Sequence, residues 1–225
     1  MGPRVNLPRD CGYMVTDRDH VYLAIENNCI KVNARSGKTE TEFNCPKIDD
    51  DHDYNWGYVA TTDGLLFGSS VRSGNFYTEG RGPWYDDSGF NNVQDSHKVL
   101  SDCLFAVDLA GNSQAWKYNG VIINSTIAIG GDHIYFVENR NPKVLQDKSR
   151  RLSGGKEWMA LQLVALDVKT GKKVWDKDMQ FEQRTPVFFS TYKDGTLIVL
   201  RSSPKSFDLR AIDAKSGKPL WNRDH

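Results

Sequence analysis

Short runs of apolar and β-branched residues recur along the chain, and each follows a turn marked by aspartate. The runs lie at 21–23, 65–67, 134–136 and 197–199, and the turns are Asp19-His20, Asp63-Gly64, Asp132-His133 and Asp194-Gly195. Asp-Gly between two such runs is a strong hairpin signal because both turn positions can adopt a positive φ, and histidine tolerates that conformation better than most residues. The pattern predicts four β-hairpins.

A second turn follows each hairpin and joins two further strands. At 165–175 and 211–221 an Ala-(Leu/Ile)-Asp run is followed by Thr-Gly or Ser-Gly and, four residues later, by Trp. The copy at 106–116 keeps the spacing from Ala to Trp but has Asn112 in the glycine position, and Asn is the next best residue for a left-handed backbone. The first copy, 31–41, keeps Gly37 but has no Trp.

Each unit therefore consists of four antiparallel strands, which we name A to D in chain order. A four-stranded unit that recurs every roughly 40 to 50 residues is the signature of a propeller blade. The sequence predicts an all-β fold, a β-propeller of four-stranded antiparallel blades, as a single region over residues 1–225. We expect blades at about 11–45, 56–118, 121–179 and 185–225, with long insertions between strands B and C at about 69–102 and 138–161.

The segment A-L-D-x-x-T-G-x-x-x-W, present at 165–175 and nearly so at 211–221, resembles the repeat of PQQ-type, quinoprotein-like propellers, the superfamily of BamB-like and quinoprotein alcohol dehydrogenase-like proteins. This resemblance implies that Trp116, Trp175 and Trp221 dock between neighbouring blades. Rings of this kind usually have seven or eight blades, which at the spacing of the last repeat needs roughly 320 to 370 residues. We therefore expect about half a ring, either a fragment that requires the remaining blades or a self-associating chain.

Neither the net charge nor the amino-acid composition indicates a particular binding partner. The chain has 29 basic and 29 acidic side chains, so its formal net charge of zero does not steer it toward nucleic acid or an anionic membrane. No apolar run has the length of a membrane span, and the first ten residues lack the apolar stretch of a signal peptide. The resemblance nevertheless implies a bacterial, periplasmic or otherwise extracytoplasmic location, so export stays open.

The four cysteines, Cys11, Cys29, Cys45 and Cys103, form no C-x-x-C motif and no adjacent pair, which argues against a zinc or redox site. We expect buried free thiols, with a disulfide between Cys29 and Cys45 as the alternative in an oxidising compartment.

The two insertions are the candidate functional region. B–C and D–A loops of a propeller lie on one face, and loops this long are uncommon unless they bind, cover or assemble something. Trp, Tyr and Arg are favoured anchors for partners. The alternatives are a loop that buries its own aromatics and a solvated basic loop. The candidate binding residues are Arg72, Tyr77, Arg81, Trp84, Tyr85 and His97 in the first insertion and Arg150, Arg151 and Trp158 in the second.

No catalytic residue and no metal site are predicted. The acidic run 49–53 lacks the ligand spacing and central glycine of a calcium loop, which leaves Asp51 and Asp53 as weak candidates. The resemblance implies that a quinone dehydrogenase would hold PQQ and calcium in its central channel, often beside a disulfide of two adjacent cysteines. No such cysteine pair exists here, so no cofactor is predicted.

The leading interpretation is a noncatalytic binding or scaffolding propeller that uses the B–C loop face for a protein or small-molecule partner. Two alternatives stay open. One is a fragment of a PQQ-dependent alcohol or sugar dehydrogenase whose remaining site residues lie outside this sequence. The other is an extracytoplasmic ligand-sensing domain of a larger protein.

Overall fold

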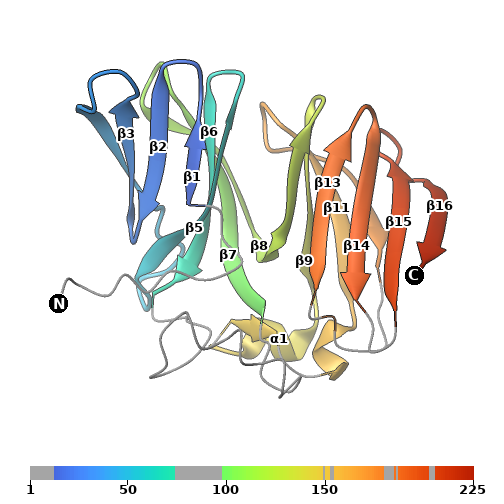
Figure 1. Ribbon diagram of the computed structural model, residues 1–225. Coiled ribbons are helices and arrows are strands. Elements are labelled where there is room, and N and C mark those ends of the chain that lie inside the picture. The colour runs from blue at the N-terminus through green and yellow to red at the C-terminus, as the bar shows by residue number, and fades with distance from the viewer. Residues whose placement is uncertain are drawn as a thin grey trace.

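A computed structural model describes residues 13–73, 98–148, 150–152, 155–179, 185, 187–202 and 206–225. Its strands form four successive antiparallel units, blades 1 to 4 (Figure 1). Blade 1 consists of β1 (Met14–Thr16), β2 (His20–Ile25), β3 (Asn28–Asn33) and β4 (Thr39–Asn44). Blade 2 consists of β5 (Tyr54–Thr62), β6 (Leu65–Arg72), β7 (Lys98–Asp108) and the first half of β8 (Ser113–Gly130).

Blade 3 consists of the second half of β8, β9 (His133–Asn139), β11 (Leu161–Asp167) and β12 (Lys173–Asp178). Blade 4 consists of β13 (Phe188–Lys193), β14 (Thr196–Ser202), β15 (Phe207–Asp213) and β16 (Pro219–Asp224). Between β9 and β11 lie α1 (Pro142–Gln146), β10 (Arg151–Leu152) and a 3-10 helix (Gly155–Trp158). The prediction of an all-β propeller with four-stranded antiparallel blades is confirmed.

Strand β8 belongs to two blades. Near its start Trp116 pairs with Ala106 of β7, and near its end Ile129 pairs with Ile134 of β9. Blades 2 and 3 are therefore joined by one continuous strand, although the sequence pattern placed a boundary between 118 and 121. A bulge between Ile123 and Ala128 changes the register midway, which allows one strand to serve two twisted sheets.

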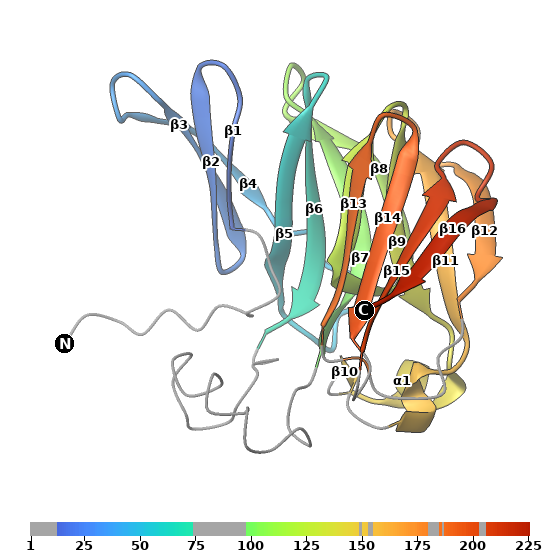
Figure 2. The same cartoon turned by 45° about the vertical axis from the view of Figure 1, so that its right-hand side comes forward.

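The A–B and C–D turns lie together at one end of the blades, which we call the upper face (Figure 1). Asn112 has φ 49°, close to the 66° of Gly171 in the next C–D turn, so it occupies the glycine position as its sequence suggests. The B–C and D–A connections lie at the opposite end with α1, on the lower face (Figures 1 and 2). This arrangement follows from antiparallel pairing within each blade.

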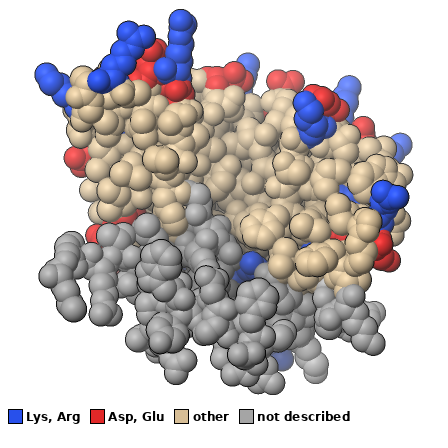
Figure 3. All heavy atoms as spheres, in the orientation of Figure 1, with Lys and Arg blue, Asp and Glu red and all other residues tan. Residues whose placement is uncertain are grey.

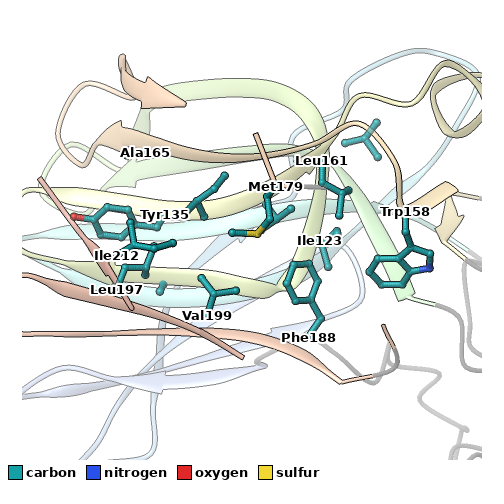
Figure 4. Packing of buried hydrophobic residues seen from close by; sticks show 14 of the residues in the cluster. Ile123, Tyr135, Trp158, Leu161, Ala165, Met179, Phe188, Leu197, Val199 and Ile212 are labelled. Atoms are coloured by element: carbon teal, nitrogen blue, oxygen red, sulfur yellow. The ribbon is translucent and has the colours of Figure 1, made fainter. Parts of the chain in front are cut away.

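Alternating side chains of neighbouring blades bury three hydrophobic clusters, one at each blade-to-blade interface. At the interface of blades 3 and 4, Tyr135 and Ala165 face Leu197, Val199 and Ile212 (Figure 4). Fully burying an aliphatic or aromatic side chain of this size stabilises the fold by about 1.5–3 kcal/mol. The blades are therefore held mainly by face-to-face packing.

The strand-D tryptophans connect consecutive blades. The indole Nε1 of Trp116 donates to the carbonyl of Val168 at 2.9 Å, and that of Trp175 donates to the carbonyl of Ala214 at 3.2 Å. Trp221 lies on blade 4, at the opposite end of the array from blade 1, and 47% of it is exposed. The four blades do not close into a ring (Figures 1 and 2).

Among the residues that the structure describes, no helix is long and apolar enough to span a membrane.

Candidate partner-binding face

The lower face collects connections that are far apart in the sequence. The end of β6, the start of β7, α1 and the connection between β4 and β5 all meet there (Figures 1 and 2). β6 continues to Arg72 and β7 begins at Lys98, so both flanks of the insertion expected at 69–102 are strand. Five candidates in this insertion, Tyr77, Arg81, Trp84, Tyr85 and His97, lie outside the described residues.

Asp102 on β7 is the centre of this face. Its carboxylate accepts from Arg72 Nε at 2.6 Å and from Arg150 Nε. The hydroxyl of Tyr54 lies 3.2 Å from the same carboxylate. Only 6% of the Asp102 side chain and 11% of each arginine side chain are exposed. A buried charge is costly unless it is paired and hydrogen-bonded. The charges of Asp102, Arg72 and Arg150 are therefore stable in this position only together.

The hydroxyl of Tyr54 bridges Asp102 to the acidic connection before β5, since it also lies 3.0 Å from Asp49. Burial and the negative charges of Asp102 and Asp49 raise the pKa of Tyr54, so it remains a donor. Burial opposes the charge of Arg72, but its hydrogen bond to Asp102 raises the pKa of that guanidinium above the ordinary value. The hydrogen bond with His52 lowers the pKa of Asp49.

Arg72 also reaches two other connections. Its Nη1 lies 3.1 Å from Nε2 of His52 and 3.2 Å from the carbonyl of Lys148. Nδ1 of His52 lies 2.9 Å from Asp49. When the His52 proton is on Nδ1, that nitrogen donates to Asp49 and Nε2 accepts from Arg72. One arginine thus joins the end of β6, the D–A connection and the second insertion.

Arg150 holds α1 in place. Its Nη1 donates to the carbonyls of Val144 at 2.7 Å and Leu145 at 2.9 Å, at the end of the helix. The carbonyl of Val144 also accepts the Asp147 amide at 3.2 Å, and a cation at a helix C-terminus interacts favourably with the last carbonyls and with the dipole. Arg72 and Arg150 therefore do come together on this face, and these guanidinium donors bind groups of the chain itself. The backbone of Arg151 pairs with Val99 in the short ladder of β10 and β7, and its side chain lies outside the described set.

Trp158 is fully buried. Its ring packs edge-on against Phe188 of blade 4, with 6.0 Å between the ring centroids (Figure 4). The sequence placed it among candidate binding residues because Trp in a long loop is a favoured anchor. In the structure it anchors the second insertion to the core between blades 3 and 4, because the 3-10 helix turns its side chain inward.

A polar hollow of about 340 Å³ lies beside the Asp102 network, between blades 1 and 2. Tyr54 belongs to both the hollow and the network, and Lys47 and Asp53 form an exposed ion pair at 3.3 Å at its rim. The hollow is lined by Glu26, Asn27, Cys45, Lys47, Asp53, Tyr54, Asn55 and Ser73. Its lining includes the exposed side chains of Glu26, Lys47 and Asp53, which suit a polar ligand or peptide segment.

The described residues contain no group of three or more His, Cys, Asp or Glu side chains arranged to hold a metal ion. Asp53 faces Lys47, and the amide of Asp51 donates to Asp49 at 3.1 Å within the turn.

Cys29, Cys45 and Cys103 are buried free thiols. Burial raises the pKa of each to about 12, so they remain protonated and behave as small apolar side chains. Cys11 lies outside the described residues.

Sequence reasoning missed Asp102, Tyr54 and His52 as members of this network. Asp102 follows Leu100 and precedes Cys103 and Leu104 in a strand that is otherwise largely buried. A carboxylate in such a run was the available signal, because Asp is almost never buried unless it is paired.

In the view of Figure 3 the charged side chains stand along the upper edge, over the A–B and C–D turns, and along the right-hand side. These turns are closed by short local bonds, such as the one from the Thr170 amide to Asp167 at 2.8 Å. Apart from the tryptophan contacts between consecutive blades, the upper face consists of local turns, whereas on the lower face Arg72 and Arg150 join connections that are far apart in the sequence.

No family model matches the sequence, and no curated protein matches it. Solved structures do match. BamB from Moraxella catarrhalis is 9% identical with a TM-score of 0.58, over 99% of this chain and 52% of that one. A chain of the mitotic checkpoint complex is 10% identical with a TM-score of 0.58, over 98% of this chain and 52% of that one.

A quinohemoprotein alcohol dehydrogenase from Pseudomonas putida is 12% identical with a TM-score of 0.54, over 93% of this chain and 34% of that one. This chain thus spans about half the length of the first two proteins and a third of the dehydrogenase. At such low identity the likeness shows the fold alone: the chain is built as a β-propeller.

Proposed function

We propose that this protein is a noncatalytic binding or scaffolding propeller, and that its lower face receives a protein partner. The observation that supports this is the Asp102 network, which fixes the end of β6, the D–A connection and the second insertion in one arrangement. A surface ordered before binding loses less conformational entropy when the partner arrives. The hollow beside Tyr54 gives the partner a polar recess to enter.

The solved structures support the propeller scaffold and not the identity of the partner. One of them belongs to a protein assembly, the mitotic checkpoint complex. A propeller with different chemistry, the quinohemoprotein alcohol dehydrogenase, has the same fold, and fold alone does not decide between binding and catalysis. We also infer a bacterial, extracytoplasmic location from the repeat resemblance, which fractionation of the source cells would test.

The test compares the two faces within one chain. A photo-reactive amino acid is introduced at Lys148 on the lower face or at Lys169 in an upper C–D turn, both of which are exposed lysines. After irradiation in cells of the source organism, we expect discrete protein adducts from position 148 and none from position 169. Equal labelling from both positions, or adducts from 169 alone, would contradict the proposal.

The dehydrogenase alternative has its own measurement. PQQ with calcium is titrated into the purified chain while its absorbance is followed, and dye-linked oxidation of alcohols is assayed in parallel. Saturable quinone binding with turnover would replace the noncatalytic proposal. We expect neither, because the sequence lacks the two adjacent cysteines whose disulfide often lies beside the quinone in such dehydrogenases.

A further inference from the structure

Consecutive blades in this chain are joined by a repeated two-part contact. The first part is a strand-D tryptophan, and the second is the C–D turn of the next blade. Trp175 donates to the carbonyl of Ala214 at 3.2 Å, and its ring lies over Gly217, where an added Cβ would be 2.9 Å from Cε3. Trp116 makes the same contact with Val168 and lies over Gly171, where an added Cβ would be 2.6 Å away.

Among the described residues, each end of the four-blade array has one part of this contact without its partner: blade 4 has the tryptophan and blade 1 has the receiving turn. At the end of blade 4, Trp221 pairs with Ala211 as Trp175 pairs with Ala165, so it points away from blade 3. At the start of the array, blade 1 has the receiving turn of residues 33–38. The Ala34 amide donates to the Asp19 carbonyl at 2.9 Å, as the Ala214 amide donates to Gly195 at 2.9 Å.

The receiving turn of blade 1 is uncovered among the described residues. An added Cβ on Gly37 would meet no atom within 4 Å, whereas the same atom on Gly171 or Gly217 would meet a tryptophan. Ala34 is exposed, but its equivalent Ala214 is only 2% exposed because blade 3 covers it. Within the part of the chain that the structure describes, the turn therefore has the same docking geometry as the turns at Gly171 and Gly217, but no tryptophan lies over it.

The sheet faces at the two ends are apolar as well. On blade 4, Val199 faces blade 3, so by alternation Ile198 and Leu200 face outward, opposite Ala211 and Leu209. On blade 1, Tyr22 and Ala24 face blade 2, so Val21 and Leu23 face outward, opposite Val32 and Ile30. Val21 and Val32 of blade 1 are paired at the same distance from their turns as Leu197 and Ile212 of blade 4. In blade 4 this pair packs against blade 3, so in blade 1 the pair Val21 and Val32 is placed to pack against a preceding blade.

We propose that blade 4 of one molecule docks on blade 1 of a second copy, with Trp221 on the Ala34–Gly37 turn, and that two copies close an eight-bladed ring through two such contacts. A second copy is the occupant that fits, because the two uncovered ends match each other in the register already used inside the chain. A head-to-tail contact closes into a ring when its rotation allows, and eight blades is a size that propellers adopt. The chain covers 52% of the length of the BamB structure.

Electrostatics do not oppose this assembly, because the chain has a formal net charge of zero and two copies repel each other little at long range. The assembly leaves the lower face open, since Asp102 lies on blade 2 and the hollow beside Tyr54 lies between blades 1 and 2, not on the outer face of blade 1. Its failure would therefore leave the proposed binding function untouched.

Sedimentation velocity of the 225-residue chain tests the proposal. We expect a compact species of twice the monomer mass over the micromolar range. Trp221→Glu and Ala34→Glu each place a charge in both contacts and should weaken association by about thirtyfold or more, the effect of losing an interface hot spot. Both positions are exposed in the single chain, so both variants should keep wild-type circular dichroism. Met159→Ala, at another exposed apolar side chain, is the control and should associate like the wild type.

Mixing the two variants separates docking from general damage. In a dimer of one Trp221→Glu chain and one Ala34→Glu chain, the unchanged Trp221 of the second chain meets the unchanged Ala34 of the first. One of the two contacts is therefore intact, and the mixture should form dimers that neither variant forms alone. A wild-type chain that stays monomeric would overturn the proposal. So would dimers that survive both substitutions, or a mixture that remains monomeric under conditions where the wild type pairs.

Discussion

The charged groups of the lower face are interdependent because water reaches them poorly. Asp102 is shared by two guanidinium groups that are themselves mostly buried. Replacing a whole buried ion cluster by apolar groups can be neutral, but removing one member leaves the others charged and unpaired. Asp102 therefore matters for stability mainly because its removal would leave the buried charges of Arg72 and Arg150 without a counter-ion.

We therefore expect Asp102→Asn to lower the free energy of unfolding by about 3–5 kcal/mol, as measured by urea denaturation. The amide keeps the shape of the side chain but cannot neutralise Arg72 and Arg150. Asp53→Asn is the matched control, because that carboxylate is 80% exposed and pairs with Lys47 at the surface. Its effect should stay within about 0.5 kcal/mol. Similar losses in the two variants would contradict this account.

The cysteines give a second prediction at this scale. In a Cys11→Ser variant the remaining thiols are Cys29, Cys45 and Cys103, which burial keeps protonated with a pKa of about 12. We expect no rapid reaction with a thiol reagent at pH 8 while the chain is folded. Three thiols should be released in denaturant without reductant, whereas recovery of only one would show that Cys29 and Cys45 had formed a disulfide.

Within a blade, local sequence was sufficient to locate the turns. Asp-Gly, Thr-Gly and Ser-Gly pairs have few alternatives to positive φ, so they mark the ends of strands directly. The continuous strand β8 could not be found in this way, because residues 118–121, Tyr-Asn-Gly-Val, resemble a break in the pattern while the backbone stays extended. The inward turn of Trp158 was equally hidden, since it depends on Phe188 of another blade.

The C–D turns allow the docking of tryptophan to be measured by a matched pair of substitutions. Gly37 and Gly171 have nearly the same φ, 69° and 66°, so replacement by alanine strains the backbone of each by about 1 kcal/mol. Only at Gly171 would the new methyl group meet an indole, that of Trp116. At low protein concentration we expect Gly171→Ala to cost about 1–3 kcal/mol more than Gly37→Ala in urea denaturation.

A double-mutant cycle identifies the source of that difference. In a Trp116→Ala background the extra cost of Gly171→Ala should largely disappear, because the two side chains no longer collide. An extra cost that persisted without the indole would show that the strain at residue 171 has another origin.

For the whole molecule, the repeats indicated the propeller because every blade must bury a face against a neighbour. The residues that form the Asp102 network could not be predicted from the sequence. Arg72, Asp102 and Arg150 are brought together by blade order and by the second insertion, and no short sequence window contains all three. In the acidic run at 49–53, Asp50, Asp51 and Asp53 are exposed, whereas Asp49 is hydrogen-bonded to Tyr54 and His52. Long-range pairing of this kind depends on the assembled blades.

The uncovered ends carry a final prediction about stability. If two copies complete a ring, the folded chain is stabilised by mass action, and its Tm rises with protein concentration. Trp221→Glu should abolish this dependence while changing the Tm of the dilute chain little, because 47% of Trp221 is exposed in the single molecule. Calorimetric scans across a hundredfold range of concentration would measure both effects. Tm values independent of concentration in the wild type would mean that the apolar faces of blades 1 and 4 remain uncovered in solution.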